Sequence, residues 1–591
     1  MLFPKINELP ACRSVTDTFR GYRRSLRVGA GEFYDMKNMT GDDYPVLSPR
    51  KPRRVAVEGV SPSGMICKDA LYYTSGTMLY KHQEGGDAAY ALGLSQPQDG
   101  EMKKLISFGA YIIILPDKMW FNTADGSFGS CDAEFYAENV EVGVGWCRED
   151  GTDYDSVLAG AEEPLEPHNG AVWLDTAQSE PVLKMWYATS AMWVVISPTY
   201  LRITCSGIGG EFDVGDCVSF HAPPTSPLRA IFGNRSYEIT AKEENYLVVS
   251  GRMNSVQQVL SGQQISVSRT MPVMDFCFEH ENRLWGCRYG AGTNGQFVNE
   301  IYASKLGDFK NWSSFRGVST DSYAASCGTD GKWTGAVKAL GYPMFFKENC
   351  LHKVYGSYPA EFQIQTIPCR GVQEGCENSL AVVNEVLYYK SRGGVCAYDG
   401  SLPACVSDAL GNEQYGEAVA GACGNKYYVS MKDGNGKWSL FCFDTQKGFW
   451  HREDALRVDA FCALGDRLFY LEHGAACIGT VAGNAGDAQE QSVQWYAETG
   501  ILGADDPDHK YVSRISVRLS MAPGTRVNFL AEYDSCGSWR MLASVAGKRL
   551  DSFSVPLRPK RCDHLRLRIE GTGEAKIFSV TLTTEQGSDI R

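Results

Sequence analysis

Compact clusters of apolar and aromatic residues recur along the middle of the chain, and each is followed by a turn and a second extended stretch. Five such pairs fall between residues 272 and 482, and from the second pair on they begin about 40 residues apart. This spacing is typical of one four-stranded blade of a β-propeller. Two earlier hairpins, at residues 65–80 and 105–121, repeat the pattern, so the sequence predicts an all-β chain with about seven blades. The five later pairs begin at Leu284-Trp285, Met344-Phe345-Phe346, Leu387-Tyr388-Tyr389, Tyr427-Tyr428-Val429 and Leu468-Phe469-Tyr470.

The blade pattern stops between residues 130 and 270. Several short strands at close spacing favour one or two small β-domains there. We therefore predict an inserted small β-barrel region, which leaves the propeller through a surface loop between two blades. The apolar and aromatic stretches that predict its strands lie at residues 172–175, 185–187, 192–196, 201–204, 212–218, 237–239 and 246–249.

Residues 494–591 alternate apolar and polar side chains in places. Ile515, Val517 and Leu519 fall on one face of an expected strand, whereas Arg518 falls on the other. This alternation is typical of a sheet with one buried and one solvated face, so we predict a C-terminal β-sandwich. The predicted organisation is an extended N-terminal segment (1–55), the first propeller blades (56–129), the inserted β-domain or domains (130–270), the remaining blades (271–482) and the sandwich (494–591).

Composition is that of a soluble globular protein, with 21% charged and 43% hydrophobic residues. The sequence has no run of about 18 apolar residues, so we predict no membrane span. The N-terminus lacks the apolar core of a signal peptide, which predicts assembly in a cytoplasm.

The 20 cysteines are scattered and form no C-x-x-C pair. A zinc ribbon or a local redox motif would need such close spacing. We interpret the cysteines as small, reduced core residues.

Charge is distributed unevenly along the chain. The first 54 residues carry eleven Lys and Arg against six Asp and Glu, a net charge of +5, whereas the rest of the chain carries −18. A basic end on an acidic body favours contact with a nucleic acid or an acidic partner, and the alternative is a solvated arm beside the first blade. The candidate contact residues are Arg20, Arg23, Arg24, Arg50, Lys51, Arg53 and Arg54.

Catalytic motifs are absent from the sequence. Sialidase-like propellers carry Asp-boxes, and residues 432–438 only imitate one, in what we interpret as a glycine-rich hairpin turn. No HExxH, G-x-S-x-G or GxxxxGK[ST] pattern occurs. We predict a protein that is not an enzyme and binds no cofactor or metal. One acidic loop, which we interpret as solvated rather than as a cation site, contains Asp505, Asp506, Asp508 and His509.

Three tryptophans of the insertion, Trp173, Trp186 and Trp193, have two interpretations. They could stack against sugar rings in a carbohydrate-binding or receptor-binding protein. They could also be core aromatics of a small β-domain, the interpretation that we favour.

The N-terminal segment contains a characteristic succession of elements. Residues 19–22 read Phe-Arg-Gly-Tyr, Asn38-Met39 follow a glycine-bearing stretch, and residues 45–52 are rich in proline and basic residues. Further on, residues 280–286 and 301–304 are followed by Gly-Asp-Phe-Lys-Asn-Trp at 307–312. These elements resemble phage tail β-propeller proteins, the nozzle (tail tubular) and DNA-stabilising hub family of short-tailed phages. The resemblance is best over residues 1–55 and about 270–450.

The resemblance implies a structural component of a virion tail, assembled in the host cytoplasm. Such proteins form homo-oligomeric rings, commonly hexamers, below the portal and adaptor, around a channel that DNA passes through. Their partners are other tail proteins: the adaptor, the portal side, and the tail tip or fibre. Two alternatives stay open, a receptor- or carbohydrate-binding tail-tip propeller and a glycosidase or depolymerase.

Overall fold

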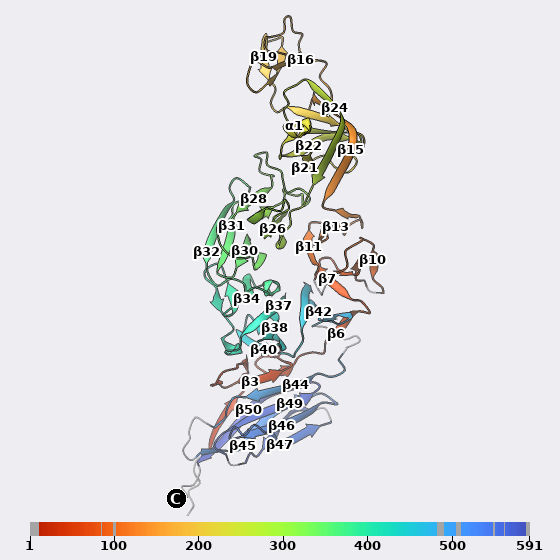
Figure 1. Ribbon diagram of the computed structural model, residues 1–591. Helices are drawn as coiled ribbons and strands as arrows, with labels where there is room; N and C mark the ends of the chain where they lie inside the picture. Colours follow the sequence, from red (N-terminus) through yellow and green to blue (C-terminus); the bar gives the residue numbers. More distant parts are fainter. Residues whose placement is uncertain are drawn as a thin grey trace, which may run out of the picture. The chain divides into compact units, whose positions relative to one another are not determined.

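The computed structural model describes residues 11–83, 85–97, 102–481, 490–503, 510–547, 550–560 and 562–586. Their regular structure is β apart from the helix α1 (Pro227–Phe232) and two 3-10 turns, η1 (Glu377–Ser379) and η2 (Asp408–Leu410). No helix in these ranges is long and apolar enough to cross a membrane. The chain divides into two compact units (Figure 1). Unit 1 contains Met1–Lys104, Thr334–Lys353 and Thr366–Arg591, and unit 2 contains Leu105–Trp333 and Val354–Gln365.

Unit 1 is built mainly from antiparallel four-stranded sheets, each formed by consecutive strands. Strands β34 and β38 are buried along most of their length, because both faces of their sheets are covered. One core extends from Phe346 through Tyr389 to Val429, which lie in three successive sheets. The strands are β7 (Pro62–Cys67), β8 (Leu71–Ser75), β9 (Met78–Lys81), β10 (Ala88–Tyr90), β29 (Gly335–Ala339), β30 (Tyr342–Lys347), β31 (Cys350–Tyr355), β32 (Gln363–Pro368, which begins in unit 2), β33 (Ala381–Val383), β34 (Val386–Ser391), β35 (Gly394–Tyr398), β36 (Ala404–Cys405), β37 (Tyr415–Cys423), β38 (Lys426–Asp433), β39 (Trp438–Asp444) and β40 (Phe449–Arg452).

Strand β6 (Arg54–Glu58), at the end of the N-terminal segment, completes the sheet of three strands formed by residues 458–480. Three consecutive strands pair in order, and β6 then adds antiparallel to β43. The sheet β7–β10 packs against this composite sheet, since Met65 and Tyr73 share a core with Phe469 and Ile478. Early and late parts of the sequence are therefore joined in unit 1. The composite sheet contains β41 (Val458–Leu464), β42 (Arg467–Glu472), β43 (Cys477–Thr480) and β6 (Arg54–Glu58).

The N-terminal segment also links β40 to the C-terminal part of unit 1. β2 (Gly21–Tyr22) pairs antiparallel with β40 and parallel with β3 (Glu32–Lys37), and β3 pairs antiparallel with β44 (Gln494–Thr499). Gly21 is needed at this contact. Its φ is +84°, and a Cβ atom would lie 2.2 Å from the carbonyl oxygen of Trp450. A ten-stranded sheet results, which runs from β37 to β47.

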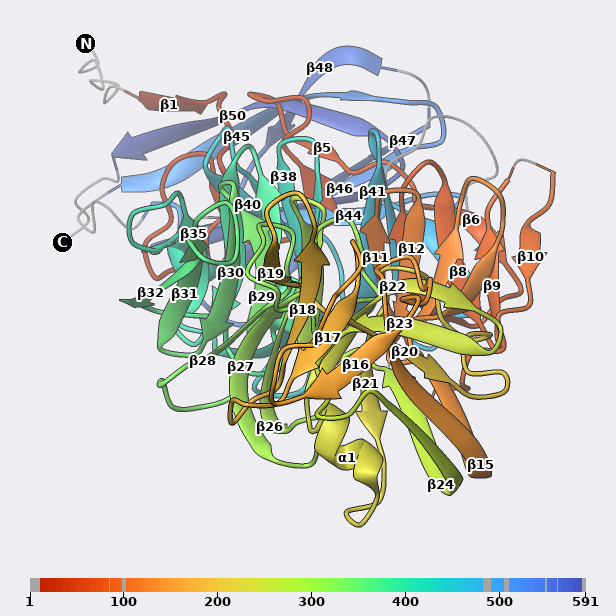
Figure 2. The same cartoon turned by 90° about the horizontal axis from the view of Figure 1, so that it is seen from above.

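Two sheets share one core at the C-terminal end of unit 1, in the orders β44-β49-β46-β47 and β1-β50-β45-β48. Phe529 and Ile569 of the first sheet and Ile515 and Val517 of the second are fully buried in this core. Figure 2 shows β1 beside β50, with which it pairs antiparallel. The strands not yet placed are β1 (Cys12–Thr16), β4 (Met39–Thr40), β5 (Ser48–Pro49), β45 (Lys510–Met521), β46 (Arg526–Tyr533), β47 (Arg540–Ala546), β48 (Leu550–Leu557), β49 (Leu565–Thr572) and β50 (Ala575–Gln586).

Unit 2 contains a closed barrel with the strand order β15-β20-β23-β22-β21-β24. The paired strands β15 and β24 run side by side as its two longest members (Figure 1). A small sheet, β16-β17-β18-β19, is inserted between β15 and β20, and its Leu174 and Leu183 join the barrel core. The strands are β15 (Ala133–Cys147), β16 (Val157–Gly160), β17 (Val172–Asp175), β18 (Val182–Tyr187), β19 (Met192–Val195), β20 (Tyr200–Thr204), β21 (Cys217–His221), β22 (Ser236–Glu243), β23 (Tyr246–Ser250) and β24 (Gln257–Arg269).

Two further four-stranded sheets of unit 2 share a core of their own. Ile113 of one and Leu284 of the other are fully buried in it, with Phe309 and Trp312 from the segment that resembles the tail proteins. Phe309 and Trp312 of that segment therefore contribute to the packing of this core. The strands are β11 (Lys104–Phe108), β12 (Tyr111–Leu115), β13 (Met119–Asn122), β14 (Phe128–Ser130), β25 (Phe276–His280), β26 (Arg283–Ala291), β27 (Phe297–Ala303) and β28 (Tyr323–Ser326).

The predicted all-β class and the predicted small barrel are confirmed. The sequence patterns do not predict β15 and β24, because polar residues interrupt the alternation of apolar side chains in both strands. In the structure, their pairing also shifts register near Ala137 and Val140. The prediction of a strand over residues 212–218 is wrong for its first part. Val214 and Gly215 form a turn there, and the strand begins only at Cys217.

Candidate functional site

The structure corrects the predicted contact surface at two of its cations. Arg50 and Arg53 are 7% and 4% exposed, and carboxylates of unit 1 hold both guanidinium groups. They are therefore not available for contact with DNA or a partner. We call Arg50, Arg53, Glu453, Asp454 and Glu490 the arginine–carboxylate cluster.

Arg50 connects the N-terminal segment to Asp454 and Glu490, which lie far from it in the sequence. Its Nε donates to Oδ1 of Asn38 over 2.9 Å, and its two Nη atoms donate to the two carboxylate oxygens of Glu490 over 2.7 and 2.9 Å. Asn38 in turn donates from Nδ2 to the carbonyl oxygen of Gln494. Asn38 adopts the left-handed backbone conformation, with φ 55°, which asparagine tolerates better than most residues. Asn38 and Arg50, two residues that carry the resemblance, thus lie in one hydrogen-bonded network.

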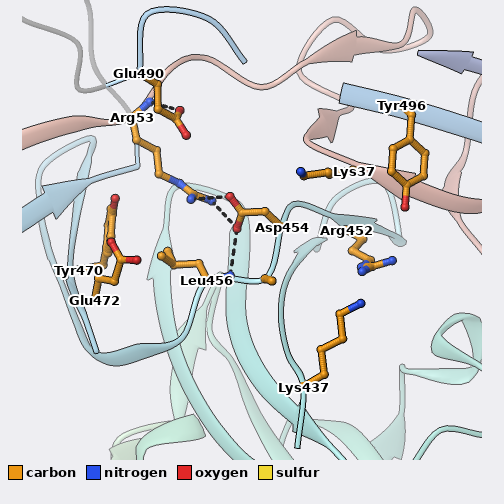
Figure 3. Close-up of a pocket in the computed structure, with 11 residues that line it drawn as sticks. Lys37, Arg53, Lys437, Arg452, Asp454, Leu456, Tyr470, Glu472, Glu490 and Tyr496 are labelled. Carbon is orange, nitrogen blue, oxygen red and sulfur yellow. Dashed lines mark hydrogen bonds and ion pairs between the residues drawn. The ribbon is translucent and has the colours of Figure 1, made fainter. Parts of the chain in front are cut away.

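Figure 3 shows the Arg53 side chain between Glu490 and Asp454. Its Nη2 donates to Glu453 over 2.6 Å, its Nη1 donates to Asp454 over 2.7 Å, and its backbone N–H donates to Glu490 over 3.0 Å. Glu453 and Asp454 directly follow β40, so the end of one sheet supplies both carboxylates. The backbone N–H of Leu456 also donates to Asp454.

Electrostatics in the cluster favour the charged forms of Asp454 and Arg53. Burial opposes the charge on Asp454, but Arg53 and Arg50 outweigh burial and hold the pKa of this carboxyl below its usual range. Burial likewise opposes the charge on Arg53, and Glu453 and Asp454 raise the pKa of its guanidinium nevertheless. A buried, hydrogen-bonded set of this kind fixes geometry more than it adds net stability, because desolvation cancels much of the attraction.

A cavity of about 680 Å³ opens beside the cluster. Arg452 in its wall is paired with Asp35 over 2.7 Å, and Arg53 is held as described. Lys37 and Lys437 make no ion pair within the described ranges, so they are the cations of this cavity that could meet an anionic group. The lining residues are Lys37, Arg53, Lys437, Arg452, Asp454, Ala455, Leu456, Tyr470, Glu472, Glu490 and Tyr496.

The other five predicted contact cations lie nearer the solvent. Arg23 pairs with Glu32 at 3.5 Å, and Arg24 lies 3.8 Å from Asp35 and 4.4 Å from the ring centre of Tyr34. The remaining three form no ion pair among the described residues: Arg20 and Lys51 are exposed and Arg54 is half-buried.

The three tryptophans of the insertion gather on one face of the sheet β16–β19. Trp173 and Trp186 each lie about 5.5 Å from Trp193, measured between ring centres. Trp173 is only 3% exposed, and the ammonium group of Lys184 lies over its ring, so it cannot stack on a sugar. Trp186 and Trp193 are half-buried and keep part of their rings accessible.

Among the described residues, no three His, Cys, Asp or Glu side chains gather in a way that could hold a metal ion. The predicted acidic loop with Asp505, Asp506, Asp508 and His509 lies outside the described residues. Sequence patterns did not identify Glu453, Asp454 and Glu490 as partners of the N-terminal arginines. The available signal was the adjacent pair of acids directly after the strand Phe449–Arg452, which begins with two aromatic residues.

Two buried histidines are expected to make the fold acid-sensitive. Burial and Lys426 lower the pKa of His451 to about 3, and burial and Lys347 lower that of His352 to about 4. Unfolded histidine titrates near pH 6.5, so below that pH the unfolded chain binds protons that the folded chain excludes. Each histidine should therefore cost about 1.4 kcal/mol of unfolding free energy per pH unit as the pH falls from about 6.5 to about 4.

Thermal unfolding followed between about pH 7 and pH 4.5 measures this loss. The variants His451→Gln and His352→Gln should each flatten the pH dependence by about one proton. Equal slopes in the wild type and in both variants would contradict the assignment.

Comparisons with known proteins do not place the chain in a family. No family model matches it, and no curated protein matches it. Raptor from Chaetomium thermophilum aligns with a TM-score of 0.29 at 8% identity, over 73% of this chain and 29% of Raptor. An arabinoxylan arabinofuranohydrolase of glycoside hydrolase family 43 from Bacillus subtilis aligns with a TM-score of 0.19 at 8% identity, over 52% of this chain and 94% of the enzyme. At such scores neither likeness carries an argument about fold or function.

Proposed function

We propose that this protein is a structural subunit of a phage tail that forms a homo-oligomeric ring, a nozzle or hub, around a DNA channel below the portal and adaptor. The observation that carries the proposal is the role of the residues on which the resemblance rests. Asn38 and Arg50 are buried and interlocked, Gly21 lies against the backbone of β40, and Phe309 and Trp312 are core residues. Residues of this kind stabilise the fold, as expected for a protein with a structural role.

We propose further that the chain forms one seven-bladed propeller with an inserted barrel and a C-terminal β-sandwich. Seven sets of four neighbouring strands support this architecture, one of them completed by β6 and another continued into the ten-stranded sheet. Cores shared by successive sheets within each unit are the contacts that adjacent blades make. The protein then acts mechanically rather than as an enzyme, and of the predicted contact cations Arg20, Lys51 and Arg54 remain for DNA or a partner.

Negative-stain microscopy of the purified protein tests the proposal. We expect rings of about six copies, because virion tail components of this kind assemble with closed symmetry. Mass spectrometry of purified virions from a phage that encodes the chain should then find the protein in the tail. A monomer that binds host cells would favour the alternative, a receptor- or carbohydrate-binding tail-tip propeller. Release of reducing sugar from the host envelope, lost when a carboxylate is replaced, would favour a glycosidase or depolymerase.

The alternative has one specific observation in its favour. The hairpin of β18 and β19 presents Tyr187, Met192 and Val195 at 45%, 53% and 54% exposure, beside the partly accessible Trp186 and Trp193. Exposed apolar groups in such density often mark a binding surface. A Trp193→Ala variant that keeps its rings but loses attachment to host cells would assign this hairpin a receptor role within the tail.

A further inference from the structure

Cys67 and Cys462 lie together in unit 1, although 395 positions separate them in the sequence. Their Sγ atoms are 2.9 Å apart, which is closer than the usual contact between non-bonded sulfur atoms. Cys67 is the last residue of β7, and Cys462 lies in β41. Each strand is an edge strand of its own four-stranded sheet.

The packing of the two sheets brings the two sulfur atoms close together. Cys67 lies opposite Leu71 in its sheet, and Cys462 lies opposite Phe469. Leu71 and Phe469 are buried in the core that joins the sheets, and both cysteines pack against this core. Regular strands, rather than loops, therefore hold the two thiols in place. Both cysteines are half-buried, so a small reagent can still reach them.

We propose that Cys67 and Cys462 form a reversible disulfide that covalently fastens the sheet β7–β10 to the composite sheet β41-β42-β43-β6. The oxidant is a low-molecular-weight disulfide of the oxidised glutathione class. The thiolate of one cysteine attacks one sulfur of this oxidant, forms a mixed disulfide and releases one glutathione thiol. The thiolate of the other cysteine then attacks the sulfur of the first and releases the second glutathione thiol. Two protein thiols are oxidised to one S–S bond, and the oxidant is reduced to two thiols.

The neighbouring Cys67 sulfur and burial raise the pKa of the Cys462 thiol. The two thiols therefore do not both ionise readily while they lie side by side. Once one of the two cysteines carries the mixed disulfide, the sulfur atoms are already placed for the second step.

The bond would add a second covalent link between two sheets that the backbone already joins from β6 to β7. At one edge of the composite sheet, β6 is attached by backbone hydrogen bonds and continues through the chain into β7. The disulfide would tie β7 to β41, the strand at the opposite edge. It would also close a loop of 395 residues in the unfolded chain, and long loops give the largest constraint on the unfolded state.

Peptide mapping of the wild-type protein tests the proposal without any substitution. The folded protein is incubated with oxidised or reduced glutathione, remaining thiols are alkylated, and tryptic peptides are analysed by mass spectrometry without reduction. We expect a cross-linked peptide pair that contains Cys67 and Cys462 only after oxidation, and a higher midpoint of thermal unfolding that dithiothreitol reverses. Recovery of both cysteines as separate alkylated peptides, or bonded to other cysteines, would overturn the proposal.

Matched variants separate this bond from general oxidation. Cys67→Ser and Cys462→Ser should each abolish the cross-link and the rise in the unfolding midpoint. Cys536→Ser is the control, since Cys536 is exposed and its hydrogen bonds are to Ser538 rather than to a thiol. An oxidised Cys67→Ser protein that gains as much thermal stability as the wild type would show that another bond is responsible.

Discussion

Replacing Arg53 by alanine should destabilise unit 1 by about 3–5 kcal/mol, because the change leaves the buried Glu453 and the half-buried Asp454 without their main counter-charge. Arg53 makes contacts of 2.6 and 2.7 Å to these two carboxylates and is only 4% exposed. The loss should appear as a lower midpoint of chemical or thermal unfolding. Limited proteolysis should then cut the N-terminal segment more rapidly, because the cluster is one of its attachments.

The control for this prediction is Lys51→Ala. It removes the same charge two positions away, but Lys51 is exposed and forms no ion pair among the described residues. We expect a change of less than about 0.5 kcal/mol for it. A second variant, Arg53→Met with Glu453→Gln and Asp454→Asn, removes the charges together and should recover part of the stability. If Arg53→Ala were as stable as Lys51→Ala, the cluster would not hold the segment.

Gly21→Ala should cost about 2–5 kcal/mol, the sum of a strained backbone and a steric overlap. The φ of Gly21 is +84°, and the new Cβ would lie 2.2 Å from the carbonyl oxygen of Trp450. Strand β2 would have to leave β40 to relieve the overlap. Unfolding midpoints measure the cost, and hydrogen exchange at Tyr22 reports whether the pairing is lost.

Gly59→Ala distinguishes the two contributions. Gly59 also has a positive φ, +71°, but no atom lies within 4 Å of the position that its Cβ would take. It should therefore show only the backbone cost, about 1–2 kcal/mol. Equal losses for the two variants would mean that the contact between β2 and β40 contributes nothing.

Local strands were predictable from the sequence, because the apolar clusters coincide with buried strands. The clusters at Tyr388 and Tyr428 fall in β34 and β38, strands that are buried almost throughout. The pairing partners were not predictable, because they lie far apart in the chain. Strand β6 pairs with β43, and β3 pairs with β44, more than 400 residues later.

The same limit applies to the candidate site. The N-terminal arginines were visible as charge, but net charge does not distinguish a solvated cation from a buried one. The acids that lie against Arg50 and Arg53 include Glu453 and Glu490, which come from a distant part of the chain. The Cys67–Cys462 contact was missed for a related reason. A search for closely spaced cysteines cannot find two thiols that distant strands bring together.

The pairing of β6 with β43 has a consequence for synthesis. Residues 54–58 emerge early from the ribosome, but their partner β43 is made only after residue 477. At typical rates of translation the strand waits on the order of tens of seconds with its hydrogen-bonding edge unpaired. During that time it is a template for pairing with other nascent chains. Chaperone capacity and the speed of translation between residues 58 and 477 should therefore govern how much of this protein reaches its folded state.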